Sequence, residues 1–319
     1  MKSLLLAIAL TALLVPATRA GQAAPAPAST SSTTSATAPA ATRHALLWKV
    51  SDADSAVYLL GAFHLLKQDD YPLPAEVDRA FDDSAALLFE VDPAAMTAPE
   101  TVVAMQKYMG YDDGKTLSTV LPKATLDKLG TLLSASGGTL QAVEHSEQWA
   151  VNLGLLLGVT QAMGFRPELG LDRQLMERAG KAGKPAAGLE TIDEQLQAMD
   201  SAPYAEQAQG LEEFLDDPRK AVRQLQDMHD WWRAGDVTRL DTDMRAEMAR
   251  KTPESYRLLD VARNDAWLPK VEKRLAEDRK TNTLVVVGAL HLLGSDGLVE
   301  KLRARGYRVE RVCDGCAAP

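Results

Sequence analysis

Apolar residues form short, uninterrupted runs near both ends of the chain and recur at helical intervals through its middle. Such short runs between turn-forming residues are typical of buried strands. The strands predicted in this way lie at 46–50, 56–60, 85–92, 283–287 and 307–312. Helices are expected over 74–83 and from Ser295 to Arg305. Each end of the chain is therefore predicted to form a β-loop-α-β unit.

The middle of the chain is predicted to be mainly helical, because apolar side chains recur there every three or four residues. The expected helices lie at 99–109, 124–134, 146–163, 171–182, 203–216 and 219–234, with further helix to Arg279 and breaks at Pro218, Gly235, Pro253 and near Pro269. A short strand over 184–189 precedes Thr191 and Glu194, which have the spacing of a capping box. The predicted fold is α/β, with a mixed sheet built from the two end units and a large helical insertion between them.

The first residues have the pattern of an export signal. Lys2 precedes an apolar stretch over 4–15, and small residues before Ala20 offer a cleavage site. Residues 21–43 are mostly Ala, Pro, Ser and Thr, a composition typical of a flexible tether. We expect a signal peptide at 1–20, a tether at 21–43 and a single α/β domain at 44–319. The mature protein is expected in a periplasm or outside the cell, without a stable membrane span, because no later segment is both long and apolar.

Acidic residues exceed basic ones, with 44 Asp and Glu against 35 Lys and Arg. This balance argues against nucleic acid and anionic membranes as partners, because binding to phosphates requires clustered Lys and Arg. The sequence contains no Gly-rich phosphate loop, no dinucleotide fingerprint and no serine-hydrolase elbow. Nucleotide binding and serine-based hydrolysis therefore have no support.

One six-residue sequence occurs twice with a single change. Residues 61–66 read GAFHLL and residues 288–293 read GALHLL, and each follows a predicted strand. A small residue at a strand end allows the backbone to turn sharply, so that a histidine three residues later can point back over the edge of the sheet. Strands that lie side by side would bring His64 and His291 to one point. We predict that these two histidines form a functional site.

Glu90 and Asp92 end the apolar run that follows the first Gly-x-x-His motif. A carboxylate at this position is costly to bury unless it is paired or binds a metal. Two imidazoles and one carboxylate are the ligand set of a mononuclear metal site with positions open for water and substrate. The residues predict a metal centre of His64, Glu90 and His291. Asp92 is expected to lie beside this centre. An equal alternative is that its carboxylate lies at the strand end and is exposed to water.

The remaining histidines and cysteines are assigned no chemistry. His145 and His229 lie in charged helical stretches and are expected at the surface. Cys313 and Cys316 lie in a tail, where they form either a small disulfide loop or free thiols. A zinc site would need a further Cys or His pair, which this tail lacks.

Several motifs, in this order, resemble the TraB/PrgY/GumN/Tiki family over roughly His44 to Val312. They are Leu47-Trp48-Lys49-Val50, the two Gly-x-x-His motifs, Phe89-Glu90-Val91-Asp92, Gly170-Leu171-Asp172, Gly188-Leu189-Glu190-Thr191, Arg263-Asn264 and Gly294. A short exported form without a C-terminal span is most similar to the bacterial GumN-like branch.

The resemblance implies an arrangement similar to the erythromycin-esterase and ChaN-like α/β proteins. It also implies a metal-dependent peptidase, as in the Tiki branch, that favours manganese or cobalt; zinc is a further expectation. The catalytic metal ligands carried over are His64, Glu90 and His291. Residues implied to lie nearby, as substrate contacts or as scaffold ion pairs, are Asp172, Glu190 and Arg263. Arg263 would bind a substrate carboxylate or an oxyanion.

Three functions stay open at this point. The first is an exported metal-dependent hydrolase for a peptide or other small polymer, in which Glu90 or Asp92 accepts a proton from the attacking water. The second is a metal-free hydrolase similar to erythromycin esterase, with a histidine as general base. The third is a non-enzymatic protein that binds a peptide or glycan, as the PrgY-like branch suggests. We favour the first, because binding alone does not require twin histidines beside a buried carboxylate.

Overall fold

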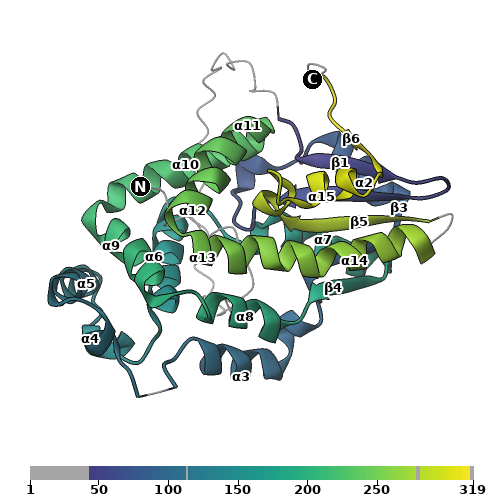
Figure 1. The fold of residues 1–319 in the computed structure, drawn as a ribbon. Coiled ribbons are helices and arrows are strands. Elements are labelled where there is room, and N and C mark those ends of the chain that lie inside the picture. Colours follow the sequence, from purple (N-terminus) through teal and green to yellow (C-terminus); the bar gives the residue numbers. More distant parts are fainter. Residues whose placement is uncertain (1–42, 113, 278–280, 317–319) are drawn as a thin grey trace, which may run out of the picture.

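The computed structural model describes residues 43–112, 114–277 and 281–316. The predicted signal peptide and the predicted tether, except Arg43, lie outside the described residues. The described chain has a sheet covered by helices on one side of the molecule and a group of helices on the other (Figure 1). The predicted α/β class with a mixed sheet is therefore confirmed.

Six strands form the sheet in the order β4-β3-β5-β2-β1-β6. Their bounds are β1 Leu47–Ser51, β2 Ala56–Ala62, β3 Ser84–Val91, β4 Ala186–Glu190, β5 Asn282–Gly288 and β6 Arg308–Arg311. The strands β4, β3, β5 and β2 run parallel, whereas β1 and β6 are antiparallel to their neighbours. The central strand β5 is buried from Thr283 onward, as its apolar sequence predicts for a strand covered on both faces. Because β2 pairs with β5, both ends of the chain complete one sheet.

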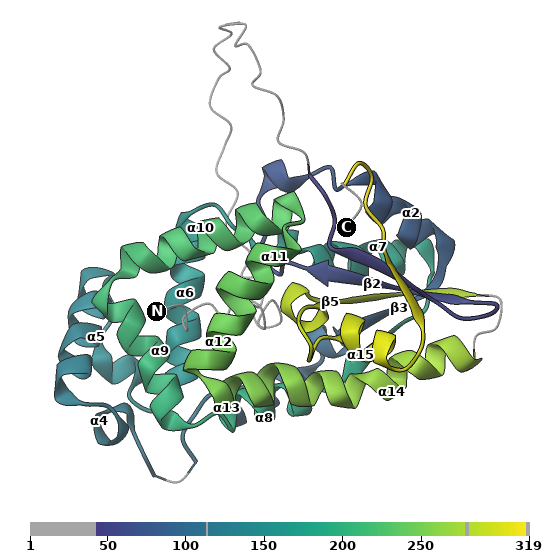
Figure 2. The same ribbon diagram turned by 45° about the horizontal axis from the view of Figure 1, so that its top comes forward.

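Helices cover both faces of the sheet (Figures 1 and 2). Those next to it are α2 Ala75–Asp83, α7 Leu171–Ala182, α14 Ala262–Glu277 and α15 Leu298–Ala304. The helices α2 and α7 share one face and are joined by the ion pair of Asp82 with Arg178. On the other face, the ion pair of Asp265 with Lys301 joins α14 to α15. The parallel strands are thus covered on both faces, as α/β architecture requires.

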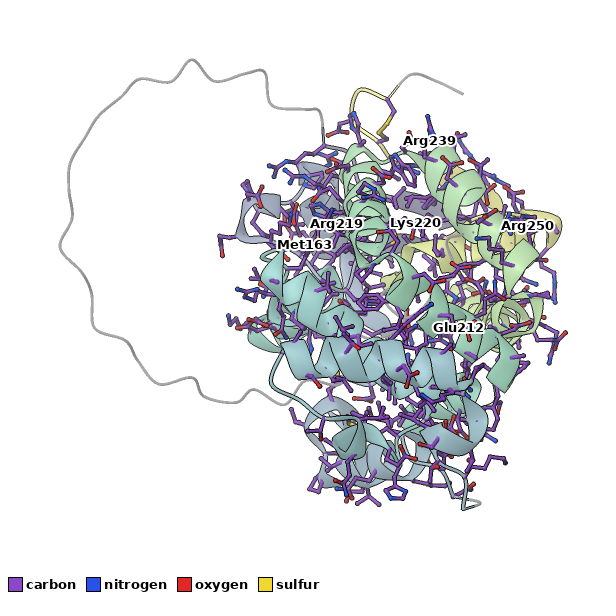
Figure 3. The ribbon with its side chains drawn as sticks, turned by 90° about the vertical axis from the view of Figure 1, so that its left-hand side faces the viewer. Met163, Glu212, Arg219, Lys220, Arg239 and Arg250 are labelled. Carbon is purple, nitrogen blue, oxygen red and sulfur yellow. A yellow bond between two sulfur atoms is a disulfide. The ribbon has the colours of Figure 1, made fainter. Side chains whose placement is uncertain are left out.

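The other helices gather beyond the carboxyl ends of the parallel strands (Figure 1). They are α3 Pro99–Tyr108, α4 Leu117–Val120, α5 Lys123–Ala135, α6 Gln148–Ala162, α8 Ile192–Asp200, α9 Tyr204–Asp216, α10 Pro218–Ala234, α11 Val237–Arg239, α12 Ala246–Lys251 and α13 Pro253–Tyr256. Two π-helical turns, at Leu240–Arg245 and Arg257–Val261, join the later helices. Figure 3 views this side of the molecule, where the labelled Arg219, Lys220, Arg239 and Arg250 project from α10, α11 and α12. None of the described helices combines the length and apolar character needed to cross a bilayer.

Local signals set several helix ends as the sequence predicts. At the start of α8, Thr191 Oγ1 accepts a hydrogen bond from the Glu194 N–H, and the Glu194 carboxylate accepts one from the Thr191 N–H. Pro218 is the first residue of α10, where its missing N–H costs nothing. The same helix ends at Gly235, whose φ of +66° is a left-handed angle that glycine tolerates best.

Two predicted helix boundaries are wrong. There is no break at Pro269, which lies inside α14. Its neighbours Trp267 and Val271 are fully buried, and burial of each side chain stabilises the helix by about 1.5–3 kcal/mol. Together they offset the cost of an internal proline, which is about 3 kcal/mol. Ser295 does not cap the last helix, because it lies within a turn closed by the Gly297 N–H and the Gly294 carbonyl, and α15 begins only at Leu298.

The tail after β6 contains a disulfide between Cys313 and Cys316, one of the two states that the sequence leaves open (Figure 3). β6 is an edge strand, and Glu310 within it is exposed. The carboxylates of functional interest are therefore those of β3 and β4, on the other side of the central strand.

Candidate active site at the carboxyl edge of the sheet

The four parallel strands end at one edge of the sheet, and each leads to a titratable side chain there. Glu190 is the last residue of β4, and Glu90 is the last but one of β3. His291 follows β5 and His64 follows its neighbour β2. The exposed fractions of these four side chains lie between 3% and 8%. Because the carboxyl ends of parallel strands share an edge, residues from four distant segments meet here.

The glycines of the two motifs act through close contacts and not through unusual backbone angles. A Cβ on Gly61 would lie 3.0 Å from Leu46 Cβ and 3.1 Å from Ala289 Cα, so only glycine fits without displacement. Gly288 has φ −51° and ψ 137°, which any residue adopts. Its N–H donates a hydrogen bond to Glu90 Oε1 at 2.7 Å. The two glycines therefore do not act as the sharp turns that the sequence predicts. Gly61 allows close packing, and Gly288 supplies a backbone N–H to Glu90.

His291 presents its Nε2 lone pair to the centre of the site. Its Nδ1 lies 2.9 Å from Asn264 Oδ1. The Asn264 amide nitrogen donates to Asp260 Oδ1 and to the Asp296 carbonyl, so the amide oxygen is the atom that accepts from His291 Nδ1. Burial, and then the positive charge of Arg263, lower the pKa of His291 well below its usual value. The imidazole is therefore neutral, with its proton on Nδ1.

His64 lies between two carboxylates. Its Nδ1 is 3.2 Å from Asp172 Oδ2, and its Nε2 is 3.6 Å from Glu90 Oε1. Asp172 comes from the first turn of α7, and Gly170 allows that helix to approach, since a Cβ there would lie 2.2 Å from the His64 carbonyl oxygen. Asp172 is the nearer of the two carboxylates and orients the ring by Nδ1, so that Nε2 faces Glu90.

Arg263 is a buried cation that connects both glutamates and one histidine. Its Nη2 donates to Glu90 Oε2 at 2.8 Å, and its Nε donates to Glu190 Oε2 at 3.0 Å. Its Nη1 lies 3.2 Å from His291 Nε2. The guanidinium also packs over the Trp267 ring, 4.6 Å from the ring centroid. Burial alone would lower the pKa of Arg263, but the two glutamates raise it above its usual value, so the charge is permanent.

Negative charge exceeds positive charge at this site. The buried carboxylates of Glu90 and Glu190 contact the buried guanidinium of Arg263, and the buried carboxylate of Asp172 lies beside His64. Burial raises the pKa of Glu190, and it raises that of the neighbouring Asp260 to about 7. Buried carboxylates in excess are stabilised by a bound cation or by a proton on a neighbouring imidazole. The charge balance therefore favours one more cation.

Part of this arrangement fits a metal ion. The 3.6 Å between His64 Nε2 and Glu90 Oε1 is close to the separation of about 3.4 Å between two ligands of a tetrahedral zinc ion. Both histidines have an oxygen beside Nδ1, a contact that orients metal-binding histidines. Among the described residues, however, the ligand atoms of His64, Glu90 and His291 do not all lie within 4.8 Å of one another. A metal bound by all three requires Arg263 to move away from His291.

The structure brings six of the seven predicted site residues together and leaves one outside. The six are His64, Glu90, Asp172, Glu190, Arg263 and His291. Asp92 was expected on the same strand face as Glu90, but β3 ends at Val91 and the chain turns there. Asp92 Oδ1 accepts a hydrogen bond from the Ala94 N–H within that turn. Its carboxylate therefore stabilises the turn.

Three further buried residues at the site were not assigned a role from the sequence. Asn264 orients His291, Gln195 Nε2 donates to Glu90 Oε2 at 3.1 Å, and Trp267 Nε1 donates to Glu190 Oε2 at 3.1 Å. A signal was present, because Trp267 lies four residues after Arg263 and hence on the same helix face. Gln195 lies in the capped first turn of the helix that follows β4.

His229 was expected at the surface and is instead fully buried, whereas His145 is exposed as expected. The His229 Nε2 atom lies 2.9 Å from Oδ2 of Asp70, which is also buried. The Phe63 ring, one residue before His64, packs edge-on against the His229 ring. The prediction was wrong because the charged neighbours of His229 lie on the outer face of α10, whereas His229 lies on the buried face.

A cleft of about 320 Å³ opens beside the site between α8 and α14. Glu190, Arg263 and Trp267 line it, together with the polar side chains of Ser201 and Lys270. This volume is within the range of small-ligand sites. Arg263 therefore contacts both the cleft and the buried histidine cluster.

The family model described as the TraB/PrgY/gumN family matches residues 46–311. The chain is also similar to the proteins named "Uncharacterized protein YbaP" of Escherichia coli (strain K12) and of Shigella flexneri. Each is 25% identical over 246 residues, which cover 77% of this chain and 87% of the relative. No solved structure matches the chain.

Proposed function

This chain belongs to the TraB/PrgY/gumN family, and from that premise we propose that it is an exported metal-dependent hydrolase that cleaves peptide bonds. The observation that carries the proposal is the matched orientation of His64 and His291. Each has an oxygen beside Nδ1 and directs Nε2 to the buried centre that Glu90 shares with Arg263. Export follows from the predicted signal peptide at 1–20, and the strand arrangement is proposed to be similar to that of erythromycin-esterase and ChaN-like proteins.

In this proposal the metal ligands are His64, Glu90 and His291, and the ion is manganese, cobalt or zinc. Such an ion, when bound, lowers the pKa of water and polarises the carbonyl group of a substrate. Asp172 and Asn264 hold the two imidazoles by Nδ1 and so keep Nε2 available. The lowered pKa of His291 keeps its lone pair free of a proton at neutral pH.

Arg263 has the charge and position to bind the substrate. It lines the cleft, and a guanidinium donates well to a carboxylate or to a developing oxyanion. A substrate group that draws Arg263 toward the cleft would withdraw it from His291 Nε2 and leave that atom available to a metal. Substrate binding and metal ligation are thereby coupled through one side chain.

Metal content and peptide cleavage test this proposal. The full chain, with its disulfide intact, is stripped by a chelator, reloaded with Mn²⁺, Co²⁺ or Zn²⁺, and analysed for bound metal and for cleavage of a peptide mixture. We expect one equivalent of metal and cleavage in the wild type and in His145→Ala, an exposed control. Both should be lost in His64→Ala and His291→Ala. A wild-type chain that retains none of the three metals would refute the proposal.

A metal-free hydrolase is the second candidate, and the position of Arg263 favours it. The guanidinium already neutralises Glu90 and faces the cleft, where it would stabilise an oxyanion. His64 and Asp172 then act as a pair, in which Nε2 accepts a proton while the carboxylate stabilises the charged ring. Cleavage that survives chelation and is lost in His64→Ala identifies this mechanism. A peptide that binds and is recovered intact identifies a binding protein instead.

A further inference from the structure

The segment that enters β1 and the segment that leaves β6 run side by side at the outer edge of the sheet. The two strands are antiparallel neighbours, and the Val312 N–H donates to the Leu47 carbonyl oxygen at 2.8 Å. The same register, continued by one step, places Leu46 opposite Cys313. Residues from the two ends of the described chain therefore become neighbours here.

Three metal-binding side chains meet where these segments run together. One ligand atom from each of His44, Cys313 and Cys316 lies within 4.8 Å of the other two. Across residues 43–112, 114–277 and 281–316, no other three His, Cys, Asp or Glu side chains approach one another as closely. A Cys-x-x-Cys pair with an imidazole supplies three of the four ligands of common zinc sites, and water can supply the fourth. The sequence predicted no zinc site because His44 comes from the opposite end of the chain and was assigned no role.

Both sides of this group are held by the rest of the protein. The His44 N–H donates to the Arg233 carbonyl oxygen at 3.1 Å, and the next N–H, of Ala45, donates to the buried Glu76 carboxylate at 3.1 Å. On the other side, Arg79 donates to Asp314, within the cysteine loop, at 2.6 Å. The His44 backbone and the cysteine loop are therefore held side by side without a metal, which reduces the ordering cost of binding one.

We propose that His44, Cys313 and Cys316 form a second metal site, which binds zinc or another thiophilic divalent cation when the two cysteines are reduced. In the disulfide, neither sulfur is a thiolate ligand. A thiol reductant transfers two electrons to the disulfide, is itself oxidised to a disulfide, and leaves two thiols on the chain. The cation then displaces one proton from each thiol and is bound by two thiolates and the His44 imidazole. The tail is thus either a disulfide loop or a metal site, according to the reductant present.

Cobalt binding to the reduced full chain tests the proposal. The chain has 2 cysteines, both in this tail, so a thiolate-to-cobalt charge-transfer band reports this site alone. The protein is reduced, freed of reductant without oxygen, and titrated with Co²⁺. We expect the band to saturate within two equivalents, because the proposed central site also takes up Co²⁺, to disappear on addition of Zn²⁺, and to be absent from the oxidised chain. A reduced chain without the band overturns the proposal, as does an equal band in the oxidised chain.

Variants distinguish the proposed ligands from a chance thiolate site. His44→Ala should weaken Co²⁺ binding by at least about tenfold, because even partners of metal ligands change affinity by that factor. His145→Ala should leave the binding unchanged, and Cys313→Ser should abolish the band. His291→Ala should keep the band, because the central site contains no sulfur. Thermal unfolding of each variant verifies that it is folded, and wild-type affinity in a folded His44→Ala variant would show the proposed site to be wrong.

Discussion

Arg263 and Glu90 form a buried ion pair, with Nη2 and Oε2 2.8 Å apart, at the point that both motif histidines face. Arg263 reaches this point from α14 and Glu90 from β3. With the pair intact, Arg263 holds His291 Nε2 and the site has the groups of a metal-free hydrolase. With the pair separated, the three proposed metal ligands become available to one ion. The position of one guanidinium therefore separates the two proposed mechanisms.

Arg263→Met should make stability strongly dependent on metal. The substitution leaves buried carboxylates without their cation, which costs about 3–5 kcal/mol in the absence of metal. Added Mn²⁺ or Zn²⁺ should restore more stability to this variant than to the wild type, because the ion replaces the guanidinium. Urea unfolding with and without metal measures the difference. Arg250→Met, at an exposed arginine, is the control, and an equal metal response in Arg263→Met and wild type would contradict the expectation.

Asp172→Asn should lower metal affinity at the central site without disrupting the fold. The amide retains the size of the side chain but no longer stabilises the proton on His64 Nδ1. Loss of such a contact typically reduces metal affinity by about 10–100-fold. Competition with a fluorescent chelator measures the affinity. Asp92→Asn is a matched control, because Asp92 stabilises a turn, and equal losses in the two variants would argue against the proposed role of Asp172.

His229→Leu should destabilise the protein by about 1–3 kcal/mol, because the buried Asp70 carboxylate loses one hydrogen-bond partner and keeps those of the Lys67 N–H and Arg233. The double variant with Asp70→Asn should lose less than the sum of the two single variants, since each single substitution already removes the contact between the two side chains. A double-mutant cycle by urea unfolding gives the coupling energy. The cycle uses His145→Leu as the surface control, and additive effects of the two buried substitutions would disprove the coupling.

Glu147→Gln should stabilise the protein at neutral pH and have less effect in acid. Burial raises the folded-state pKa of Glu147 above its usual value of 4.5, while the Tyr204 hydroxyl hydrogen-bonded to it opposes the shift. A raised carboxyl pKa means that the folded state retains the proton longer than the unfolded state. The contribution of Glu147 to stability is thus full below pH 4.5 and is lost as pH rises through the folded-state pKa.

The stability difference between Glu147→Gln and wild type should therefore grow with pH over that window and level off above it. Urea unfolding at several pH values measures this difference. Glu100→Gln, at an exposed position in α3, provides the comparison and should show no such growth. A difference that is constant with pH would show that Glu147 ionises in the folded state without penalty.

Most elements could be predicted from the sequence, because their signals are local. The apolar run of β5, the capping box before α8 and the glycine after α10 each act within a few residues. Local signals failed where packing outweighed them. Pro269 continues a helix because the residues around it are buried, and Asp92 leaves the face of Glu90 because the chain turns after Val91.

By itself, the sequence determined the strands, most of the helices, the two Gly-x-x-His motifs and the acidic end of β3, since strand and helix periodicity is a property of neighbouring residues. Only the tertiary structure decided that Arg263 lies between Glu90 and His291, that Asn264 orients an imidazole, and that His44 meets the cysteines of the tail. These contacts join residues far apart in the chain. They depend on strand order and on which helix covers which face, and those are set by the packing of the whole core.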